Sequence, residues 1–266
     1  MSESPAGIVL DMEGVLHVDW QPIDGSPHAV RELRERGVEL AILTNTTGKT
    51  RSGIAERLAA IGFEFEPARI VTAASAAADH LRRNHPAARV YALVEDGATG
   101  DLDGVELVDR PGDAEVILLG GPDETWTYGR LNAVFRALLA GAPLVAMQRN
   151  RWWPTGDGAS LDAGMFVVGL EHAARVSATV IGKPSPDIYR AACRLLSVPP
   201  ERAMMVGDDL ETDLPPAAEI GMRTCLVRTG KGSTFPAGAA VDLDLAALAA
   251  LPAALDEAAG SAPDSV

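Results

Sequence analysis

Short apolar runs of the β type alternate with helical patterns along most of the chain. The apolar runs predict buried strands at residues 8–10, 40–43, 70–71, 203–206 and 224–227. Helices are predicted from Ser26-Pro27, as N-cap and first-turn proline, to a stop at Gly37, from residue 50 to 61 with Gly62 as its end, and in the alanine-rich stretch after Val71. This alternation predicts an α/β fold with a parallel sheet and helices on both faces.

A second β/α series interrupts this pattern in the middle of the chain. Strands are predicted at residues 90–94, 116–119 and 144–147, and helices at 124–139 and 164–174. We therefore predict a core domain built from residues 1–82 and 177–258, with an inserted α/β domain at residues 83–176. The alanine-rich stretch 245–259 predicts a last helix, and residues 259–266 predict a disordered tail.

Composition and charge narrow the classes of partner. The 266 residues contain 23 Lys and Arg against 37 Asp and Glu, so the net charge is −14. An acidic surface repels nucleic acid and anionic membranes, and we expect neither as a partner. An anion-binding site in such a chain has to be locally positive.

The cysteines and the apolar segments bear on the compartment. Cys193 and Cys225 are too few for a disulfide framework, and both lie in apolar stretches. The short polar N-terminus does not resemble a signal peptide, and no apolar run approaches the roughly 20 residues of a membrane span. We expect a reduced, cytoplasmic chain.

Polar residues gather where the predicted strands end, which is the edge of an open α/β sheet that binds ligands. Each of these residues alone is more typical of a turn, a helix cap or a solvated surface. Their order along the chain is more informative than any one of them. That order is Asp11, Thr44-Asn45, Lys183, Asp208-Asp209 and, four residues after Asp209, Asp213.

Phosphoryl transfer accounts for this set of residue types, because it needs a nucleophile, charge neutralisation and a metal ion. An ionised carboxylate can attack phosphorus and form an aspartyl phosphate. Asp11 and Asp208 can hold Mg²⁺, which prefers oxygen ligands, and Lys183 balances the crowded negative charge. The Thr44 hydroxyl and the Asn45 backbone N–H can bind a phosphate oxygen.

These segments resemble the four motifs of the haloacid dehalogenase-like hydrolases. They are Asp11-Met12-Glu13-Gly14-Val15-Leu16, Ile42-Leu43-Thr44-Asn45, Gly182-Lys183-Pro184, and Gly207-Asp208-Asp209 with Asp213. The place and length of the insertion resemble the C2 cap of subfamily IIA. The stretch from residue 149 to 158, with its paired aromatics, is most similar to the branch that contains phospholysine phosphohistidine inorganic pyrophosphate phosphatase.

The resemblance implies a Rossmann-like catalytic core, an inserted C2 cap and a set of roles. Asp11 becomes the nucleophile and a metal ligand, and the Glu13 carbonyl and Asp208 are the other protein ligands of Mg²⁺. Asp209 and Asp213 orient metal-bound water or Lys183. The implied activity is hydrolysis of a small phosphorylated metabolite through an aspartyl phosphate.

Glu13 departs from the family pattern, which has aspartate two residues after the nucleophile as general acid and base. The longer side chain moves the carboxyl by one C–C bond, about 1.5 Å. A misplacement of ~1 Å can cost ~100-fold in rate, and general acid–base catalysis contributes ~10²–10⁴-fold. An alternative function therefore stays open: a phosphate- or phosphoprotein-binding module with weak turnover.

The inserted segment contributes a basic and aromatic cluster of Arg149, Arg151, Trp152 and Trp153. Such a cluster can bind the leaving group of a substrate, and an interface within the molecule or between two copies explains it equally well. A homodimer is one option for the oligomeric state. The sequence does not name the substrate, and nucleotides, sugar phosphates, pyridoxal phosphate, pyrophosphate and phosphoramidates all remain open.

A response-regulator receiver domain and a dinucleotide-binding fold fit less well. In a receiver domain the acidic pair comes on the first strand, whereas here the paired acids come last. A dinucleotide-binding fold needs a glycine fingerprint after the first strand, and residues 11–16 lack it.

Overall fold

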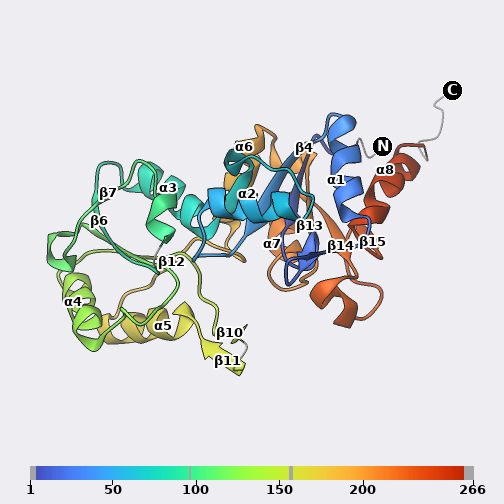
Figure 1. Ribbon diagram of the computed structural model, residues 1–266. Coiled ribbons are helices and arrows are strands. Elements are labelled where there is room, and N and C mark those ends of the chain that lie inside the picture. The colour runs from blue at the N-terminus through green and yellow to red at the C-terminus, as the bar shows by residue number, and fades with distance from the viewer. Residues whose placement is uncertain (1–3, 96, 156–157, 261–266) are drawn as a thin grey trace. The chain divides into compact units, whose positions relative to one another are not determined.

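A computed structural model describes residues 4–95, 97–155 and 158–260 (Figure 1). The chain divides into two compact units. The first comprises Met1–Thr44, Ser52–Val71 and Tyr189–Val266, and the second comprises Asn45–Arg51 and Thr72–Ile188. The chain therefore passes between the units four times. The domain boundaries predicted from the sequence stay a prediction.

The first unit is built on a six-stranded sheet in the order β15-β14-β13-β1-β4-β5. Strand β1 pairs in parallel with β13 on one side and β4 on the other, and β14 pairs in parallel with β13 and β15. The strands are β1 (Gly7–Asp11), β4 (Glu39–Thr44), β5 (Ile70–Thr72), β13 (Ala203–Gly207), β14 (Arg223–Val227) and β15 (Leu243–Leu245). The short strands β2 (His17–Val18) and β3 (Gln21–Pro22) form an antiparallel hairpin directly after β1.

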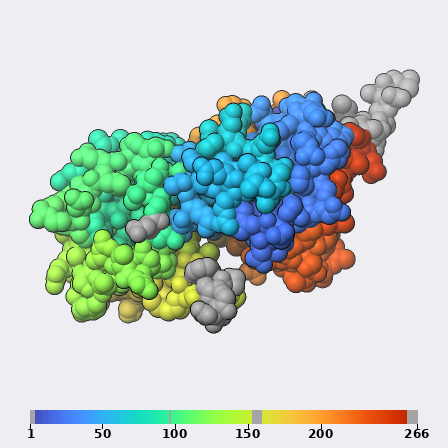
Figure 2. All heavy atoms as spheres, viewed as in Figure 1, coloured from blue at the N-terminus to red at the C-terminus, as the bar shows by residue number. Residues whose placement is uncertain are grey.

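Five helices accompany this sheet: α1 (Ser26–Glu35), α2 (Arg51–Ala60), α6 (Pro186–Leu196), α7 (Leu214–Glu219) and α8 (Leu251–Gly260). Helices α1 and α8, from opposite ends of the chain, lie side by side, as the blue and red surfaces in Figure 2 show. Arg36 ties them together through hydrogen bonds to both carboxylate oxygens of Asp256, at 2.8 and 3.0 Å.

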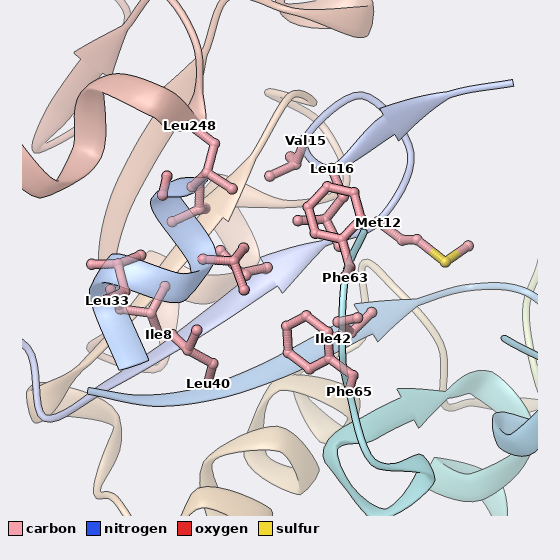
Figure 3. Close-up of a cluster of buried hydrophobic side chains, with 14 of the residues drawn as sticks. Ile8, Met12, Val15, Leu16, Leu33, Leu40, Ile42, Phe63, Phe65 and Leu248 are labelled. Carbon is pink, nitrogen blue, oxygen red and sulfur yellow. The ribbon is translucent and has the colours of Figure 1, made fainter. Parts of the chain in front are cut away.

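The core of the first unit follows from the two-residue period of its strands. Ile8 and Leu10 of β1 pack with Leu40 and Ile42 of β4 on one face of the sheet, against Phe63 and the residues of α1 (Figure 3). Val9, between the first two, is equally buried on the opposite face. Both faces of the sheet are therefore covered, as in other parallel sheets.

The second unit contains a five-stranded sheet in the order β12-β9-β8-β6-β7, and its neighbouring strands are parallel. Its strands are β6 (Arg89–Leu93), β7 (Glu106–Leu107), β8 (Val116–Leu119), β9 (Leu144–Ala146) and β12 (Thr179–Val180). Helices α3 (Ala73–Asn84), α4 (Tyr128–Leu139) and α5 (Ala163–Ala174) belong to it, as does the hairpin of β10 (Trp152–Thr155) and β11 (Gly158–Leu161). Its apolar core joins the strands β6, β8 and β9 to α4 and α5.

The predicted α/β fold class with parallel sheets is confirmed. The starts of helices α1 and α4 differ from prediction. Ser26 is not an N-cap: Gly25 occupies that position with a φ of 74°, and the Ser26 hydroxyl donates to the Val15 carbonyl. The helix predicted to begin at residue 124 begins at Tyr128, with Thr127 as its cap.

The C-terminal helix also starts later than the sequence indicates. Residues 243–245 form the edge strand β15, residues Leu248–Ala250 a 3₁₀ turn, and α8 begins only at Leu251. Of the tail predicted at 259–266, the first two residues lie in α8, and residues 261–266 lie outside the described residues. No helix of the described chain is long and apolar enough to cross a membrane.

Candidate active site

The carboxyl ends of the central strands in the first unit bring the predicted acidic residues to one edge of the sheet. Asp11 is the last residue of β1, Thr44 the last of β4, and Asp208 follows the last residue of β13. The three residues lie at the same edge of the sheet because these strands are parallel and their ends are aligned, with Leu10 opposite Val206 and Asp11 opposite Leu43. The side chains of Asp11, Thr44 and Asp208 are all buried.

Asp11, Asp208 and Asp213 form a buried carboxylate cluster. One oxygen from each lies within 4.8 Å of the others. Three carboxylates this close repel one another when ionised, and a cation between them removes the repulsion. The all-oxygen donor set fits a hard divalent cation. Asp213, for which the sequence predicts an orienting role, is therefore also close enough to act as a ligand, while the Glu13 carbonyl stays a predicted ligand.

The Asp209 side chain contacts the turn that follows it and the side chain of Lys231. Its Oδ1 accepts hydrogen bonds from the backbone N–H groups of Glu211 at 2.7 Å and Thr212 at 3.1 Å, and its Oδ2 lies 2.7 Å from the Lys231 ammonium. Burial alone raises the pKa of Asp209, but the hydrogen bonds from Lys231 and the two N–H groups outweigh it and lower the pKa to about 2. Asp209 is therefore held ionised.

Lys231 is a functional candidate that the sequence analysis missed. It lies in Thr229-Gly230-Lys231-Gly232, after the end of β14, and its backbone N–H donates to Asp208 Oδ2 at 2.7 Å. The signal that could have found it is its place in the sequence: a lysine between two glycines, a few residues after the strand predicted at 224–227.

Glu13 is held by the hairpin that follows β1. Its Oε1 accepts the Asp19 backbone N–H at 2.9 Å, and its Oε2 lies 3.0 Å from Nδ1 of His17. Burial acts to raise the pKa of Glu13, but the hydrogen bonds from His17 and Asp19 prevail and lower the pKa below its ordinary value. Both carboxylate oxygens are therefore engaged inside the loop, although the side chain is 55% exposed.

The aromatic residues of this hairpin stabilise it. His17 is fully buried and stacks on Trp20 with ring centroids 4.5 Å apart, and the Arg57 guanidinium lies 3.9 Å from the centre of the Trp20 ring. Asp19 and Trp20 adopt left-handed backbone conformations, with φ of 49° and 59°. This conformation is unfavourable for a bulky side chain, so the stack compensates for local strain in the loop that holds Glu13.

In the second unit, Asn45 and Lys183 are joined although they lie 138 positions apart in the sequence. The Asn45 side-chain amide donates to the Lys183 carbonyl at 2.9 Å, and its oxygen accepts the Lys183 backbone N–H at 2.7 Å. Gly182 makes this approach possible, because a Cβ there would lie 2.7 Å from Asn45 Oδ1. The Asn45 side chain thus fixes the loop of the buried Lys183, a role beyond the backbone contact predicted for it.

The four residues predicted to form a basic and aromatic cluster in the insertion have different surroundings. The Arg149 guanidinium forms an ion pair with Glu171 at 2.6 Å, Arg151 is exposed, and Trp152 is 53% exposed on β10 opposite Leu161. The side chain of Trp153 lies outside the described residues. A role of the cluster in binding a leaving group stays a prediction.

Comparison with known proteins places these residues in a wider context. Residues 8–108 match the family model described as haloacid dehalogenase-like hydrolase, and residues 180–249 match a second model of HAD-hydrolase-like proteins. The human haloacid dehalogenase-like hydrolase domain-containing protein 2 is 35% identical over 224 residues, 84% of each chain. The phospholysine phosphohistidine inorganic pyrophosphate phosphatase of Danio rerio is 34% identical, covering 86% of this chain and 85% of that protein.

Solved structures of phosphatases have a similar fold. The p-nitrophenyl phosphatase from Archaeoglobus fulgidus superposes with a TM-score of 0.86 at 26% identity, over 94% of this chain and 99% of that one.

Proposed function

Because this chain belongs to the haloacid dehalogenase-like hydrolase family, we propose that it is a Mg²⁺-dependent phosphatase acting on a small phosphorylated metabolite. The family resemblance and the hydrolase class predicted from the four motifs are thereby confirmed. The observation that carries the proposal is the buried cluster of Asp11, Asp208 and Asp213 at the carboxyl edge of a parallel sheet. The names of the two phosphatases described above support the same reaction class.

In the proposed reaction a carboxylate oxygen of Asp11 attacks phosphorus, the bond from phosphorus to the leaving oxygen breaks, and an aspartyl phosphate forms. Water then attacks the phosphorus and releases inorganic phosphate and the Asp11 carboxylate. Bound by Asp11 and Asp208, Mg²⁺ would neutralise negative charge on the phosphoryl oxygens. Asp213 would be its additional ligand or would orient its water.

The remaining residues have supporting roles. The Thr44 hydroxyl and the Asn45 backbone N–H bind a phosphoryl oxygen, and Lys183 offsets the negative charge of the phosphoryl group. The reciprocal hydrogen bonds between the Asn45 side chain and the Lys183 backbone hold residues 45 and 183 in a fixed relation to each other. Asp209 is held ionised by Lys231, and it orients the turn that carries Asp208.

Glu13 supports a second candidate function. A general acid has to carry a proton when the leaving group departs, and the contacts with His17 and Asp19 favour the ionised form of Glu13. A chain that retains the metal site but protonates the leaving group poorly is a phosphate- or phosphoprotein-binding module with slow turnover. Rearrangement of the hairpin on substrate binding would instead release Glu13 for catalysis.

The two functions are separated by a rate measurement. A panel of phosphorylated metabolites and an aryl phosphate is assayed for phosphate release with Mg²⁺ and again with EDTA, using the wild-type chain and Asp11→Asn as a near-isosteric control. Metal-dependent turnover that disappears in Asp11→Asn supports the phosphatase. Equal release by both proteins, or release that is indifferent to EDTA, refutes it. Tight metal-dependent binding of a phosphorylated ligand with turnover near background would favour the binding module.

A further inference from the structure

The loop Thr229-Gly230-Lys231 follows β14, belongs to none of the four motifs, and contacts two of them. The Thr229 hydroxyl donates to the Gly14 carbonyl at 2.5 Å, in the hairpin segment after Asp11. The Lys231 backbone N–H donates to Asp208 Oδ2 at 2.7 Å. One short loop therefore connects the segment after the nucleophile with a carboxylate of the acidic cluster.

Two glycines let the Asp208 carboxylate lie between these backbone segments. Gly14 and Gly230 both adopt left-handed conformations, with φ of 83° and 50°. A Cβ at either position would overlap Asp208 Oδ2, and a Cβ at 230 would also lie only 2.7 Å from the Gly14 Cα. Any side chain at 14 or 230 therefore displaces the carboxylate or separates the two loops.

We propose that the Thr229–Lys231 loop is a positioning element for a divalent cation at Asp11, Asp208 and Asp213. The carboxylate of an aspartate can rotate about its side-chain bonds, and repulsion from two neighbouring carboxylates favours rotation out of the cluster. The N–H of Lys231 binds one oxygen, and the close backbone at Gly14 and Gly230 restricts the remaining motion. The loop thus holds Asp208 in the orientation that the cluster requires before a cation binds.

This inference rests on the metal site of the proposed function, and it adds residues that act on the cation only through Asp208. Groups that hydrogen-bond to metal ligands typically contribute about 10- to 100-fold in metal affinity. The loop should therefore affect cation binding in the absence of substrate, where catalysis does not contribute.

The experiment measures binding of Mg²⁺ and Mn²⁺ to the metal-free, full-length protein by titration calorimetry, with a thermal melt to establish that each variant is folded. Gly230→Ala introduces a methyl group against Asp208. Gly238→Ala is its matched control, because Gly238 has a φ of 86° and no non-adjacent residue within 4 Å of the position that a Cβ would occupy. We expect cation affinity to fall about 10- to 100-fold in Gly230→Ala and to stay at the wild-type value in Gly238→Ala.

A second pair of variants tests the loop without left-handed strain. Thr229→Val removes the hydroxyl bonded to the Gly14 carbonyl and nearly keeps the side-chain shape, whereas Thr229→Ser retains a hydroxyl. We expect cation affinity to fall in Thr229→Val and to recover in Thr229→Ser. A loss of stability alone would lower the melting temperature without changing the affinity of the folded protein.

Three results would contradict the positioning role of the loop or the proposed function on which it rests. Wild-type affinity in both Gly230→Ala and Thr229→Val overturns the positioning role and leaves the proposed function standing. Equal losses in Gly230→Ala and Gly238→Ala assign the effect to backbone strain and also overturn it. Absence of cation binding by the wild-type protein refutes the proposed function itself, and the inference with it.

Discussion

The ion pair between Asp209 and Lys231 should make a measurable, pH-dependent contribution to stability. Asp209 Oδ2 and Lys231 Nζ are 2.7 Å apart, and the Asp209 side chain is 9% exposed. The contacts that lower the pKa of Asp209 from 3.8 to about 2 in the folded protein are lost on unfolding. The folded state is therefore stabilised whenever Asp209 is ionised.

Asp209→Asn tests this contribution with little change in shape. The amide oxygen can still accept the N–H groups of Glu211 and Thr212, so the substitution mainly removes the negative charge beside Lys231. One unit of pKa corresponds to about 1.4 kcal/mol, which sets an upper limit of about 2.5 kcal/mol. The Lys231 side chain is 69% exposed, and solvent screening together with the retained hydrogen bonds reduces the expected loss to about 1 kcal/mol at neutral pH.

The sign of the pH dependence follows from the direction of the pKa change. A carboxylate with a lowered folded pKa stabilises the protein fully above its unfolded pKa, near 4, and loses that contribution as pH falls through about 2. The difference in unfolding free energy between wild type and Asp209→Asn should therefore shrink in acid, to about half its neutral value near pH 3.

The assay is urea unfolding of the metal-free protein between pH 7 and pH 3. A double-mutant cycle with Lys231→Met isolates the pair. Asp244→Asn is a comparison variant. The Asp244 side chain is 34% exposed, against 9% for Asp209, so its ion pair with Arg228 should contribute less to stability. A difference for Asp209→Asn that does not change with pH, or a cycle with no coupling to Lys231, would refute the reasoning.

Four further substitutions, at three positions, test other parts of the structure. If Glu13 exchanges protons in the reaction, Glu13→Gln should lower kcat about 100-fold or more. Glu13→Asp should also lower kcat, because a side chain about 1.5 Å shorter cannot keep both contacts in the hairpin. Equal rates in the wild type and both variants would show that Glu13 takes no part in the reaction. If Mg²⁺ binds at the acidic cluster, it should raise the melting temperature of the wild type and not that of Asp208→Asn, and an equal rise in both proteins would exclude Asp208 as a ligand. Phe63→Ala should lower the free energy of unfolding in urea by about 3–5 kcal/mol, because Phe63 is fully buried; a loss below about 1 kcal/mol would contradict its place in the core.

The strands and the edge that carries the acidic residues were predictable because local pattern determines both. Ile8-Val9-Leu10 is apolar on both faces, and Asp11 interrupts it at the residue where the strand ends. Parallel pairing then brings Asp11 and Asp208 together although they lie far apart in the sequence. The proximity of Asp11 and Asp208 therefore follows from strand ends alone, whereas Asp213 joins them from the turn before α7.

The β2–β3 hairpin was not predictable from local signals. Two-residue hairpin turns with positive φ at both positions favour Asn and Gly, whereas this turn is formed by Asp19 and Trp20. The contacts of Trp20 with His17 and Arg57 stabilise it, and Arg57 comes from a helix far along the chain. These tertiary contacts override the local preference, so the position of Glu13 also depends on packing.

The late start of the last helix has a similar cause. Leucine and alanine in residues 243–250 are compatible with a helix, and no glycine or proline separates them from α8. Pairing with β14 places Leu243–Leu245 at the edge of the sheet instead. Helix propensity differs by only a few tenths of a kcal/mol among such residues, so the hydrogen bonds of an available strand edge decide the outcome.

If a divalent cation and a phosphate group bind at the acidic cluster as proposed, the charges there make their binding interdependent. Asp11, Asp208, Asp213 and Asp209 carry four negative charges when ionised, and Lys231 contributes one positive charge beside them. A phosphate group approaching this edge is repelled, in a chain whose net charge is already −14. A divalent cation removes two of these charges and offers the phosphate a ligand position. In the proposed phosphatase, the carboxylates that would bind the cation would also oppose phosphate binding in its absence, so substrate affinity is expected to follow cation occupancy.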